Sequence, residues 1–522
     1  MDGMDVKYPI GIQSFSQIRE EGYKYVDKTA FVYRLANYGA YYFLSRPRRF
    51  GKSLLLSTLE AYFMGRKELF EGLEIEKLQK DPWPENVPIF RIDLSPTDYC
   101  DFSKLENMLD GLLESWEELY GKRESEKDYE MRFGGVIRRA HEQRGQRVVI
   151  LIDEYDTPII ANLHNPELSV RMRNLLKGFY TNIKAQGEHI RFAFITGVSR
   201  FSKVTIFSGI NNLEDISLDN DYSAICGITE DELEVNFKKG IEQLAKNQDQ
   251  SYEDALAKLR AEYDGYKFSS RGEHIYNPFS LLHCLKSGEY GQYWYATGTP
   301  TFLLKMLEQG NWDLYELVND PVSAKTFSDI EAYRQNPVAI LFQTGYLTIR
   351  DYDREERRYY LDFPNREVRE GFLTGLLPLY THLPRIGDTF RLMAFIRSIR
   401  EGKVDVMMEY FDSLFANIPY DDAVKEEMDV RNIFVAVLYL TVGYIHAEIH
   451  THKGRIDILI KTEKYLYIIE LKYNRSVAEA LKQIEEREYA KPFLLDGREL
   501  IKLGINFNPA TRSLEWGEIQ EM

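Results

Sequence analysis

The sequence predicts an α/β protein in three parts: a parallel-sheet domain over residues 1–225, a mostly helical middle region over 226–390, and a smaller α/β domain over 391–522. Two observations predict this. Buried-type apolar runs alternate with helical segments in the first part, as expected for parallel strands covered on both faces. Near the end of the chain, two strand patterns flank a short turn around Glu463-Lys464.

In the first part, residues 39–45 predict a buried strand and the residues after Gly51 predict a helix. Three further apolar runs predict strands over residues 87–95, 147–153 and 190–196. Between the last two, Asn165-Pro166 is typical of a helix start, and the pattern extends to about Ala185.

In the middle region, Thr229 with Glu232 has the spacing of a capping box, and Ser251 and Thr299-Pro300 predict two more helix starts. Strand patterns are expected over residues 339–352 and 357–363, and in the last part over 455–462 and 464–473. The aromatic-rich pieces over residues 263–268, 292–298 and 357–363 are interpreted as core, and stacking on single-stranded bases is the alternative.

Composition favours a packed protein of the cytoplasm. Three widely spaced cysteines exclude a disulfide scaffold and a cysteine zinc site, and they fit a reducing compartment. The longest uncharged apolar stretch, residues 433–445, is shorter than the ~20 residues of a membrane span, and the first ten residues do not resemble a signal peptide. A net charge of −16 argues against nonspecific coating of nucleic acid. We expect no membrane partner.

A basic segment joins the first strand to its helix. In a phosphate loop, backbone N–H groups cradle phosphates, a lysine reaches the β- and γ-phosphates, and a hydroxyl ligates Mg²⁺. Gly51, Lys52 and Ser53 match the end of this motif, but Arg46 replaces its first glycine, so a basic loop without a nucleotide is the alternative. The candidate nucleotide-binding residues of the loop are Arg46, Pro47, Arg48, Arg49, Phe50, Gly51, Lys52 and Ser53.

The strand over residues 147–153 ends in Asp153-Glu154, the pattern of a Walker B element. There the aspartate holds Mg²⁺ and the glutamate orients the attacking water. Thr196 ends the neighbouring strand, where a sensor of the γ-phosphate would lie. Arg200 could stabilise transition-state charge in its own chain or in a neighbouring subunit of a homo-oligomer, or it is a surface arginine. All these residues follow predicted parallel strands, at the edge where ligands bind.

A second constellation stands near the C-terminus: Asp457, then twelve residues, then Glu470 and Lys472. The last two are two positions apart and share one face of a strand. Two carboxylates can hold Mg²⁺ and a lysine can stabilise charge on a phosphate, which is the PD-(D/E)XK arrangement for phosphodiester hydrolysis. A hairpin with an exposed ion pair is the alternative. Glu448 could complete the carboxylate set.

His446, His450 and His452 alternate with Glu448, so on a strand they share one face. A zinc site is conceivable there, but a row on a strand has no evident closing ligand. The favoured interpretation is that these residues line a substrate cleft or a solvated edge of the sheet.

Together, GIQSF (11–15), YVDKT (25–29), SRPRRFGKS (45–53), LIDEYD (151–156) and TGVSRFSK (196–203) resemble the AAA-ATPase-like family of bacterial predicted ATPases. The likeness covers about residues 8–220. Loops of the RPRRFGK form are usual in that family, so the resemblance implies ATP as the nucleotide.

The stretch over about residues 430–510 resembles the PD-(D/E)XK nuclease domain that is commonly attached to such ATPases. The resemblance implies that Asp457 and Glu470 are metal ligands, Lys472 the catalytic lysine, Glu448 an auxiliary carboxylate and Gln483 an orienting residue. The expected fold is therefore a P-loop parallel-sheet ATPase domain, a helical middle region and a restriction-endonuclease-like α/β domain.

The leading hypothesis is an ATPase coupled to a Mg²⁺-dependent nuclease that acts on DNA. The alternative is an ATP-dependent regulatory switch whose C-terminal fold only binds a partner or nucleic acid. A third reading, in which both sites have decayed, is disfavoured because both residue sets are complete.

Overall fold

The computed structural model divides into two compact units, residues 1–298 with 321–365 and residues 299–320 with 366–522. The elements of residues 226–298 and 321–365 therefore group with the N-terminal sheet, and the expected boundaries at 225 and 390 stay predictions. The residues that the structure describes are 6–163, 165–200, 206–207, 210, 212–298, 303, 321–326, 337–381, 392–416, 418, 424–445, 448–450, 457–493 and 496–521.

The first unit is built on a five-stranded sheet in which every pairing is parallel, in the order β2-β3-β4-β1-β5. Its strands are β1 (Tyr41–Ser45), β2 (Ile89–Asp93), β3 (Val148–Asp153), β4 (Ile190–Gly197) and β5 (Glu214–Asp215). All six residues of β3 are buried, as its unbroken apolar run predicts. The four predicted strands are confirmed; β5 has two residues, too few to leave a pattern.

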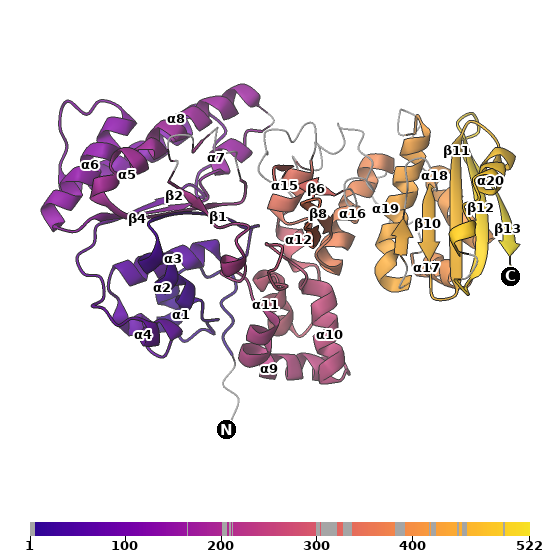
Figure 1. Ribbon diagram of the computed structural model, residues 1–522, viewed down its shortest axis with the longest axis horizontal. Helices are drawn as coiled ribbons and strands as arrows, with labels where there is room; N and C mark the ends of the chain where they lie inside the picture. The colour runs from indigo at the N-terminus through magenta and orange to yellow at the C-terminus, as the bar shows by residue number, and fades with distance from the viewer. Residues whose placement is uncertain are drawn as a thin grey trace. The chain divides into compact units, whose positions relative to one another are not determined.

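Helices cover both faces of this sheet (Figure 1). One face carries α1 (Phe15–Glu20), α2 (Thr29–Tyr38), α3 (Lys52–Phe63) and α4 (Glu74–Leu78), and the other carries α5 (Phe102–Tyr120), α6 (Tyr129–Arg144), α7 (Thr157–Ile160) and α8 (Pro166–Ala185). The predicted start of α8 is confirmed, because the Asn165 side chain accepts a hydrogen bond from the Leu168 N–H at 3.3 Å.

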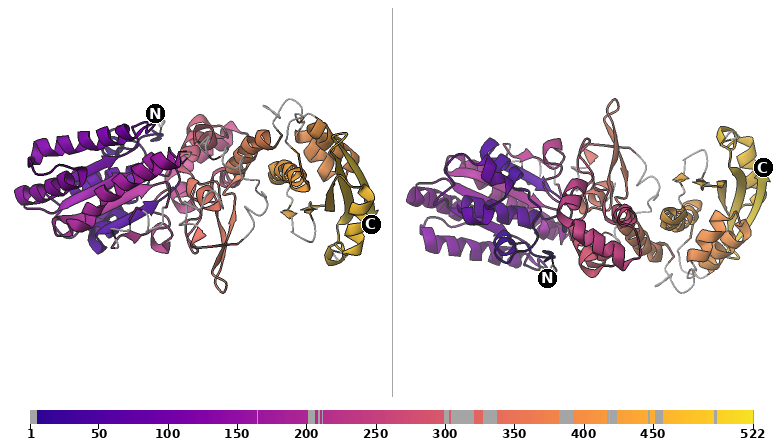
Figure 2. Two further views of the ribbon diagram at one scale, coloured as in Figure 1. Left: turned by 90° about the horizontal axis from the view of Figure 1, so that it is seen from above. Right: turned by 90° about the horizontal axis from the view of Figure 1, so that it is seen from below.

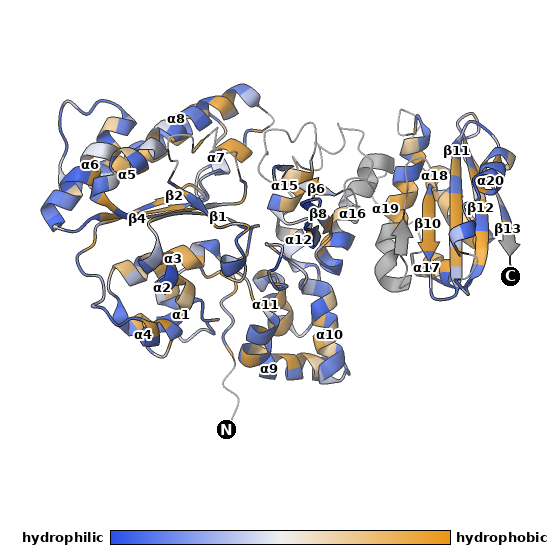
Figure 3. Cartoon of the chain, in the orientation of Figure 1, coloured by the Kyte–Doolittle hydropathy of each residue, from blue (hydrophilic) through white to orange (hydrophobic). Residues whose placement is uncertain are grey.

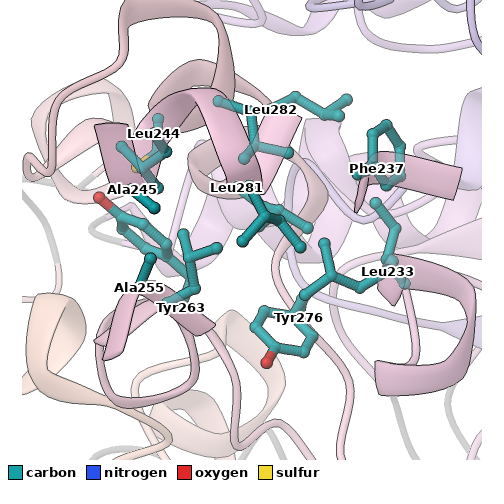
Figure 4. Packing of buried hydrophobic residues seen from close by; sticks show 14 residues of the cluster. Leu233, Phe237, Leu244, Ala245, Ala255, Tyr263, Tyr276, Leu281 and Leu282 are labelled. Carbon is teal, nitrogen blue, oxygen red and sulfur yellow. The ribbon is translucent and has the colours of Figure 1, made fainter. Parts of the chain in front are cut away.

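Four helices follow in the same unit: α9 (Glu230–Asn247), α10 (Tyr252–Tyr263), α11 (Pro278–Ser287) and α12 (Tyr293–Gly298). The capping box of Thr229 and Glu232 is confirmed, and Ser251 caps α10. These helices bury an apolar cluster that includes Phe237 and Leu281 (Figure 4). The helix expected from Thr299-Pro300 lies outside the described residues.

The strand prediction over residues 339–352 was wrong in its first half. Val338–Thr344 is a helix, α15, which ends at Gly345 with φ 91°. A short apolar run is compatible with a buried helix as well as with a strand, and Gly345 adopts the left-handed conformation that ends helices. The strands β7 (Thr348–Asp353) and β8 (Arg358–Asp362) follow as an antiparallel hairpin, which Figure 2 shows in projection, and β8 also pairs with β6 (Val322–Ser323).

The second unit has a mixed sheet in the order β13-β12-β11-β10-β9, in which only β11 and β12 pair in parallel. The predicted strand pair around Glu463-Lys464 is confirmed as β10 and β11. The strands are β9 (Glu448–His450), β10 (Ile458–Lys461), β11 (Tyr465–Tyr473), β12 (Glu499–Asn508) and β13 (Ser513–Glu521); the helices are α16 (Arg366–Thr381), α17 (Leu392–Arg400), α18 (Val404–Ala416), α19 (Glu427–Ile445) and α20 (Val477–Glu486).

The central strands of this sheet are strongly apolar (Figure 3) and are covered on both faces. Leu466 and Ile468 of β11 pack with Ile484 of α20. Tyr467, between them, points to the opposite face and donates to the Ile399 carbonyl of α17 at 2.6 Å. By the same alternation, Glu470 and Lys472 lie on the α20 face. Among the described helices, α19 included, none is long and apolar enough to cross a membrane.

Candidate functional site

The phosphate loop runs from the end of β1 to the first residue of α3. Gly51, with φ 92°, turns the chain into the helix, and Lys52 follows as its first residue. The buried Lys52 Nζ donates to the carbonyls of Arg46 at 3.1 Å and Pro47 at 3.2 Å, and it lies 3.3 Å from Glu154 Oε1. The structure thus brings the loop lysine beside the end of β3, as a Walker A and Walker B pair requires.

The other side chains of the loop divide into two groups. Arg46 is buried and donates to the carbonyls of Ser217 and Tyr222, and burial lowers the pKa of Arg46 to about 10. Phe50 is also buried and stacks edge-on against Tyr266, 4.7 Å between ring centroids. Arg48 and Arg49 are exposed. Only the main chain of Arg46 and Phe50 is therefore placed to contact a phosphate, and the binding roles of these residues stay predictions.

Asp153 ends β3 almost completely buried. Its Oδ2 accepts from Arg91 Nη2 at 3.1 Å. Burial raises the pKa of Asp153, while the Arg91 charge and the Ser53 hydroxyl oppose that rise. Its Oδ1 is buried and has no hydrogen-bond partner among the described residues. An unsatisfied carboxylate oxygen next to a serine hydroxyl is the donor set that Mg²⁺ prefers, so these residues fit a divalent cation.

The remaining predicted residues of the nucleotide site, Glu154, Thr196 and Arg200, stand at or just after the carboxyl ends of β3 and β4. Glu154 has φ 50°, a strained conformation for a residue with a side chain, which is often found at functional sites. The buried Thr196 hydroxyl donates to the Leu44 carbonyl at 2.8 Å, which ties the end of β4 to β1. Arg200 Nε lies 2.6 Å from Asp215 Oδ2 of β5. Residues 201–203 of the motif lie outside the described residues.

The sequence analysis missed the buried Asp156, which joins the ends of β3 and β4. It accepts hydrogen bonds from the Val198 N–H at 3.3 Å, the Ser199 N–H at 2.5 Å and the Ser199 hydroxyl. Burial raises the pKa of Asp156 to about 6. A Cβ at Gly197 would overlap Asp156 Oδ1, so this close approach requires glycine. Asp156 stands in the LIDEYD motif, but the local pattern does not indicate a partner 43 residues away.

In the second unit, the structure brings Asp457, Glu470 and Lys472 together. Lys472 Nζ donates to Glu470 Oε1 at 2.8 Å and to the Leu471 carbonyl at 2.9 Å. The Leu471 N–H donates to Asp457 Oδ2 at 2.8 Å, which fixes this carboxylate beside β11. Glu470 Oε2 is buried, with no hydrogen-bond partner in the described part of the chain.

The electrostatics of this group favour a divalent cation. Burial, followed by the charge of Asp457, raises the pKa of Glu470 to about 7, against the opposing charge of Lys472. Burial also raises the pKa of Asp457. The charges of the two close carboxylates repel each other, and a bound divalent cation relieves that repulsion. No group of three or more His, Cys, Asp or Glu within the described ranges is arranged to hold a metal, so water or substrate oxygens would complete the coordination.

Gln483 lies beside this group on α20, where its amide donates to the Tyr489 hydroxyl at 3.3 Å. It lines a cavity of about 370 Å³. The other lining residues are Asp457, Lys472, Arg475, Glu479, Lys482, Glu486, Arg487 and Tyr489.

Glu448 is not brought to the group. It pairs with Lys461, four residues along β10 from Asp457, which is about 13 Å of strand. Its auxiliary role stays a prediction; its side chain and that of His450 are not described, and His446 and His452 lie outside the described residues.

Two residues of α19 that the sequence analysis missed lie at this group instead. Arg431 Nη1 is 4.0 Å from Asp457 Oδ1. Burial raises the pKa of Glu427, and the charges of Lys472 and Asp457 both act on it. Glu427 and Arg431 are four residues apart and therefore share a helix face. Both residues stand in the first turns of α19, where several residues are acidic. Their spacing in the sequence matches no motif, so it does not mark either side chain as part of a site.

Comparison with known proteins agrees with this arrangement. Residues 9–207 match the family described as "Predicted AAA-ATPase", and residues 425–517 match the PD-(D/E)XK nuclease superfamily. A protein of Azotobacter chroococcum mcd 1, named "Uncharacterized protein in vnfD 5'region", is 36% identical over 519 residues, which cover 97% of this chain and 98% of that protein. The chain therefore belongs to the AAA-ATPase-like family, in a form that carries a C-terminal domain of the PD-(D/E)XK nuclease superfamily.

Proposed function

We propose that this protein hydrolyses ATP and cleaves DNA in a metal-dependent reaction, with the two activities in separate units of one chain. The observation that carries the proposal is the group of Asp457, Glu470 and Lys472. Lys472 Nζ donates to one oxygen of the Glu470 carboxylate, and the other oxygen is buried without a hydrogen-bond partner among the described residues. Such a group is costly for a fold to keep unless a cation and a phosphate use it.

In the first unit, Lys52 and the N–H groups at the start of α3 would hold the β- and γ-phosphates of ATP. Ser53 and Asp153 would hold Mg²⁺, which supplies charge neutralisation on the phosphates. Glu154 would orient the water for attack. Because Arg200 is paired with Asp215 of its own chain, we favour an action of Arg200 within the same subunit.

In the second unit, Asp457 and Glu470 would hold Mg²⁺, which supplies Lewis acidity toward the scissile phosphate. Lys472 would orient the attacking water and stabilise the charge that develops on the phosphate. Gln483, which lines the same cavity, would orient the substrate. DNA is the substrate we propose, and the cytoplasm the compartment, where the free thiols of Cys100, Cys226 and Cys284 would stay reduced.

A nuclease assay on the full chain tests this proposal. Single-stranded DNA, duplex DNA and RNA of one sequence are incubated with Mg²⁺ or Mn²⁺, each with no nucleotide, ADP or ATP. We expect metal-dependent cleavage of DNA that Asp457→Ala abolishes. Cleavage of RNA alone would overturn the choice of substrate, and cleavage that persists in Asp457→Ala would overturn the site.

The same assay with Lys52→Ala tests the coupling. We expect ATP to gate cleavage, so the variant should cleave less than the wild type in the presence of ATP. Equal cleavage with and without nucleotide would mean that the two activities are only tethered.

One observation favours the regulatory switch as a second candidate. On the cavity wall, Lys482 pairs with Glu486 at 3.4 Å and Arg475 with Glu479 at 3.9 Å, so the attraction for a polyanion is weakened. ATP hydrolysis without any cleavage of nucleic acid would support the switch.

A further inference from the structure

The Gln343 side chain of helix α15 contacts the nucleotide edge of the first unit. Gln343 is 4% exposed. Its Oε1 accepts from the Arg200 N–H at 2.9 Å, and its Nε2 donates to the Arg200 carbonyl at 3.4 Å. One amide thus holds both main-chain groups of a residue 143 positions earlier in the chain, at the turn that follows β4.

Two residues later, the same segment packs on the phosphate loop. Gly345 ends α15 with φ 91°, and a Cβ built there would lie 2.8 Å from Pro47 Cβ. Such a distance is closer than real Cβ atoms come to their neighbours, so the loop and the end of α15 are in direct contact. Residues 343–345 therefore connect two segments of the nucleotide site, the phosphate loop and the Arg200 turn.

The Arg200 side chain is restrained separately from its main chain. Its Nε is held by Asp215 at 2.6 Å, while Nη1 is buried without a hydrogen-bond partner among the described residues. The residue before it, Ser199, is fixed by Asp156. With Asp156, Asp215 and Gln343 in place, Arg200 has little freedom, and the two N–H groups of its Nη1 have no acceptor among the described residues.

We propose that Gln343 is a positioning residue for ATP hydrolysis: it fixes Arg200 relative to the phosphate loop, so that the guanidinium meets the charge that develops on the γ-phosphate. The inference rests on the proposed ATPase activity. In this role Gln343 would not contact the nucleotide or the metal. It acts through Arg200, and misplacing a charge-stabilising group by about 1 Å can cost about 100-fold in rate.

Two variants of Gln343 and one control variant test this positioning role. Gln343→Met keeps the length of the side chain and removes both hydrogen bonds. Gln343→Glu keeps an acceptor for the Arg200 N–H and loses the donor. Thr344→Ala is the matched control, because the Thr344 hydroxyl donates to the Ile340 carbonyl of its own helix at 2.5 Å. Thermal unfolding of each variant shows whether it folds.

Hydrogen exchange measured by mass spectrometry provides a readout that needs no activity. In the nucleotide-free protein, peptides that contain Arg200 should exchange about 10-fold faster or more in Gln343→Met than in wild type or Thr344→Ala. Gln343→Glu should lie between them. Equal exchange in all four proteins would show that Gln343 does not hold the turn, and would overturn the proposal.

Steady-state hydrolysis then tests the consequence. We expect Gln343→Met to lower kcat for ATP about 10- to 100-fold and to leave KM within about twofold, as for an interaction used only in the transition state. Adding Gln343→Met to Arg200→Ala should cost nothing further, because both act through one group. Additive losses, or a raised KM with normal kcat, would overturn the positioning role.

The failure of the proposed function is distinguishable from the failure of this inference. If the wild-type protein hydrolyses no ATP, the proposed activity is wrong. The exchange experiment then still shows whether Gln343 holds the turn that contains Arg200. A normal kcat in Arg200→Ala removes the role of Arg200 in hydrolysis and overturns the positioning proposal with it, while Lys52 and Glu154 keep theirs.

Discussion

The two sites each place a carboxylate at the end of a buried strand, but they compensate its charge differently. In the first unit, Asp153 is paired with Arg91 from the next strand, and Glu154 lies beside Lys52. In the second, Lys472 pairs with Glu470 and Arg431 lies 4.0 Å from Asp457, while Glu427 adds a third acid. In the first site, Asp153 and Glu154 each have a cationic partner. The second site has three acids for two cations, so it keeps excess negative charge and depends more on a divalent cation.

The largest expected effect is at the second site. Asp457→Ala and Glu470→Ala should each lower DNA cleavage by about 100-fold or more and weaken Mn²⁺ binding, which calorimetry measures. Lys472→Ala should lose cleavage equally but bind Mn²⁺ at least as well, since an ammonium cannot ligate a cation. ATP hydrolysis should stay near wild type in all three. Weaker Mn²⁺ binding in Lys472→Ala would contradict the charge argument.

Lys52→Ala should abolish ATP hydrolysis and weaken ATP binding about 10-fold or more, because the ammonium would face the phosphates. Arg48→Ala is the matched control, since this neighbouring cation is exposed and should change binding little. A fluorescent ATP analogue measures both affinities. Wild-type affinity in Lys52→Ala would refute the assignment of the loop.

Glu154→Gln and Asp153→Ala separate the two acids of the first site. Glu154→Gln removes the group that orients water, so it should bind ATP normally and turn over about 100-fold more slowly. Asp153→Ala should instead lose the Mg²⁺ dependence of tight binding. We expect Glu154→Gln to retain bound ATP without hydrolysing it. Normal turnover in this variant would show that another residue orients the water.

The smallest effect concerns Asp156, whose pKa burial raises from 3.8 to about 6. The folded state then binds more protons than the unfolded state between these values. The contribution of Asp156 to the free energy of unfolding therefore falls as the pH rises from about 3.8 to about 6, and is constant above. Relative to wild type, Asp156→Asn should gain stability as the pH rises from 4.5 to 6.5, measured by thermal unfolding; a constant difference would contradict it.

Local patterns predicted most of the framework. The buried runs of β1 to β4, the Asn165 helix start and the Thr229 capping box depend on neighbouring residues, and all are confirmed. Glu470 and Lys472 share a face because side chains alternate along β11, and the hairpin of β10 and β11 brings Asp457 beside them. The strand prediction over residues 339–344 was wrong for a local reason, since the short apolar run of residues 338–342 does not distinguish a helix from a buried strand.

The missed residues have a different cause. Asp156, Gln343 and Glu427 act on partners that lie elsewhere in the chain, and nothing in their own neighbourhood marks them. Gln343 holds Arg200 from 143 residues away, and Asp156 holds Ser199 from 43. Contacts of this kind arise from the packing of whole elements, so a single sequence without the fold does not contain a signal for them.

The contact between Gly345 and Pro47 has a consequence for synthesis on the ribosome. The phosphate loop is complete once Ser53 has been made, but α15 follows about 290 residues later. At about 5–20 residues per second, the nascent loop lacks its contact with the end of α15 for roughly 15–60 s. During that time the surface of Pro47 that Gly345 covers is open to chaperones and proteases. A chain cut before Val338 would carry the whole phosphate loop and still lack one of its neighbours, so shortened versions should be unstable even where every motif of the nucleotide site is kept.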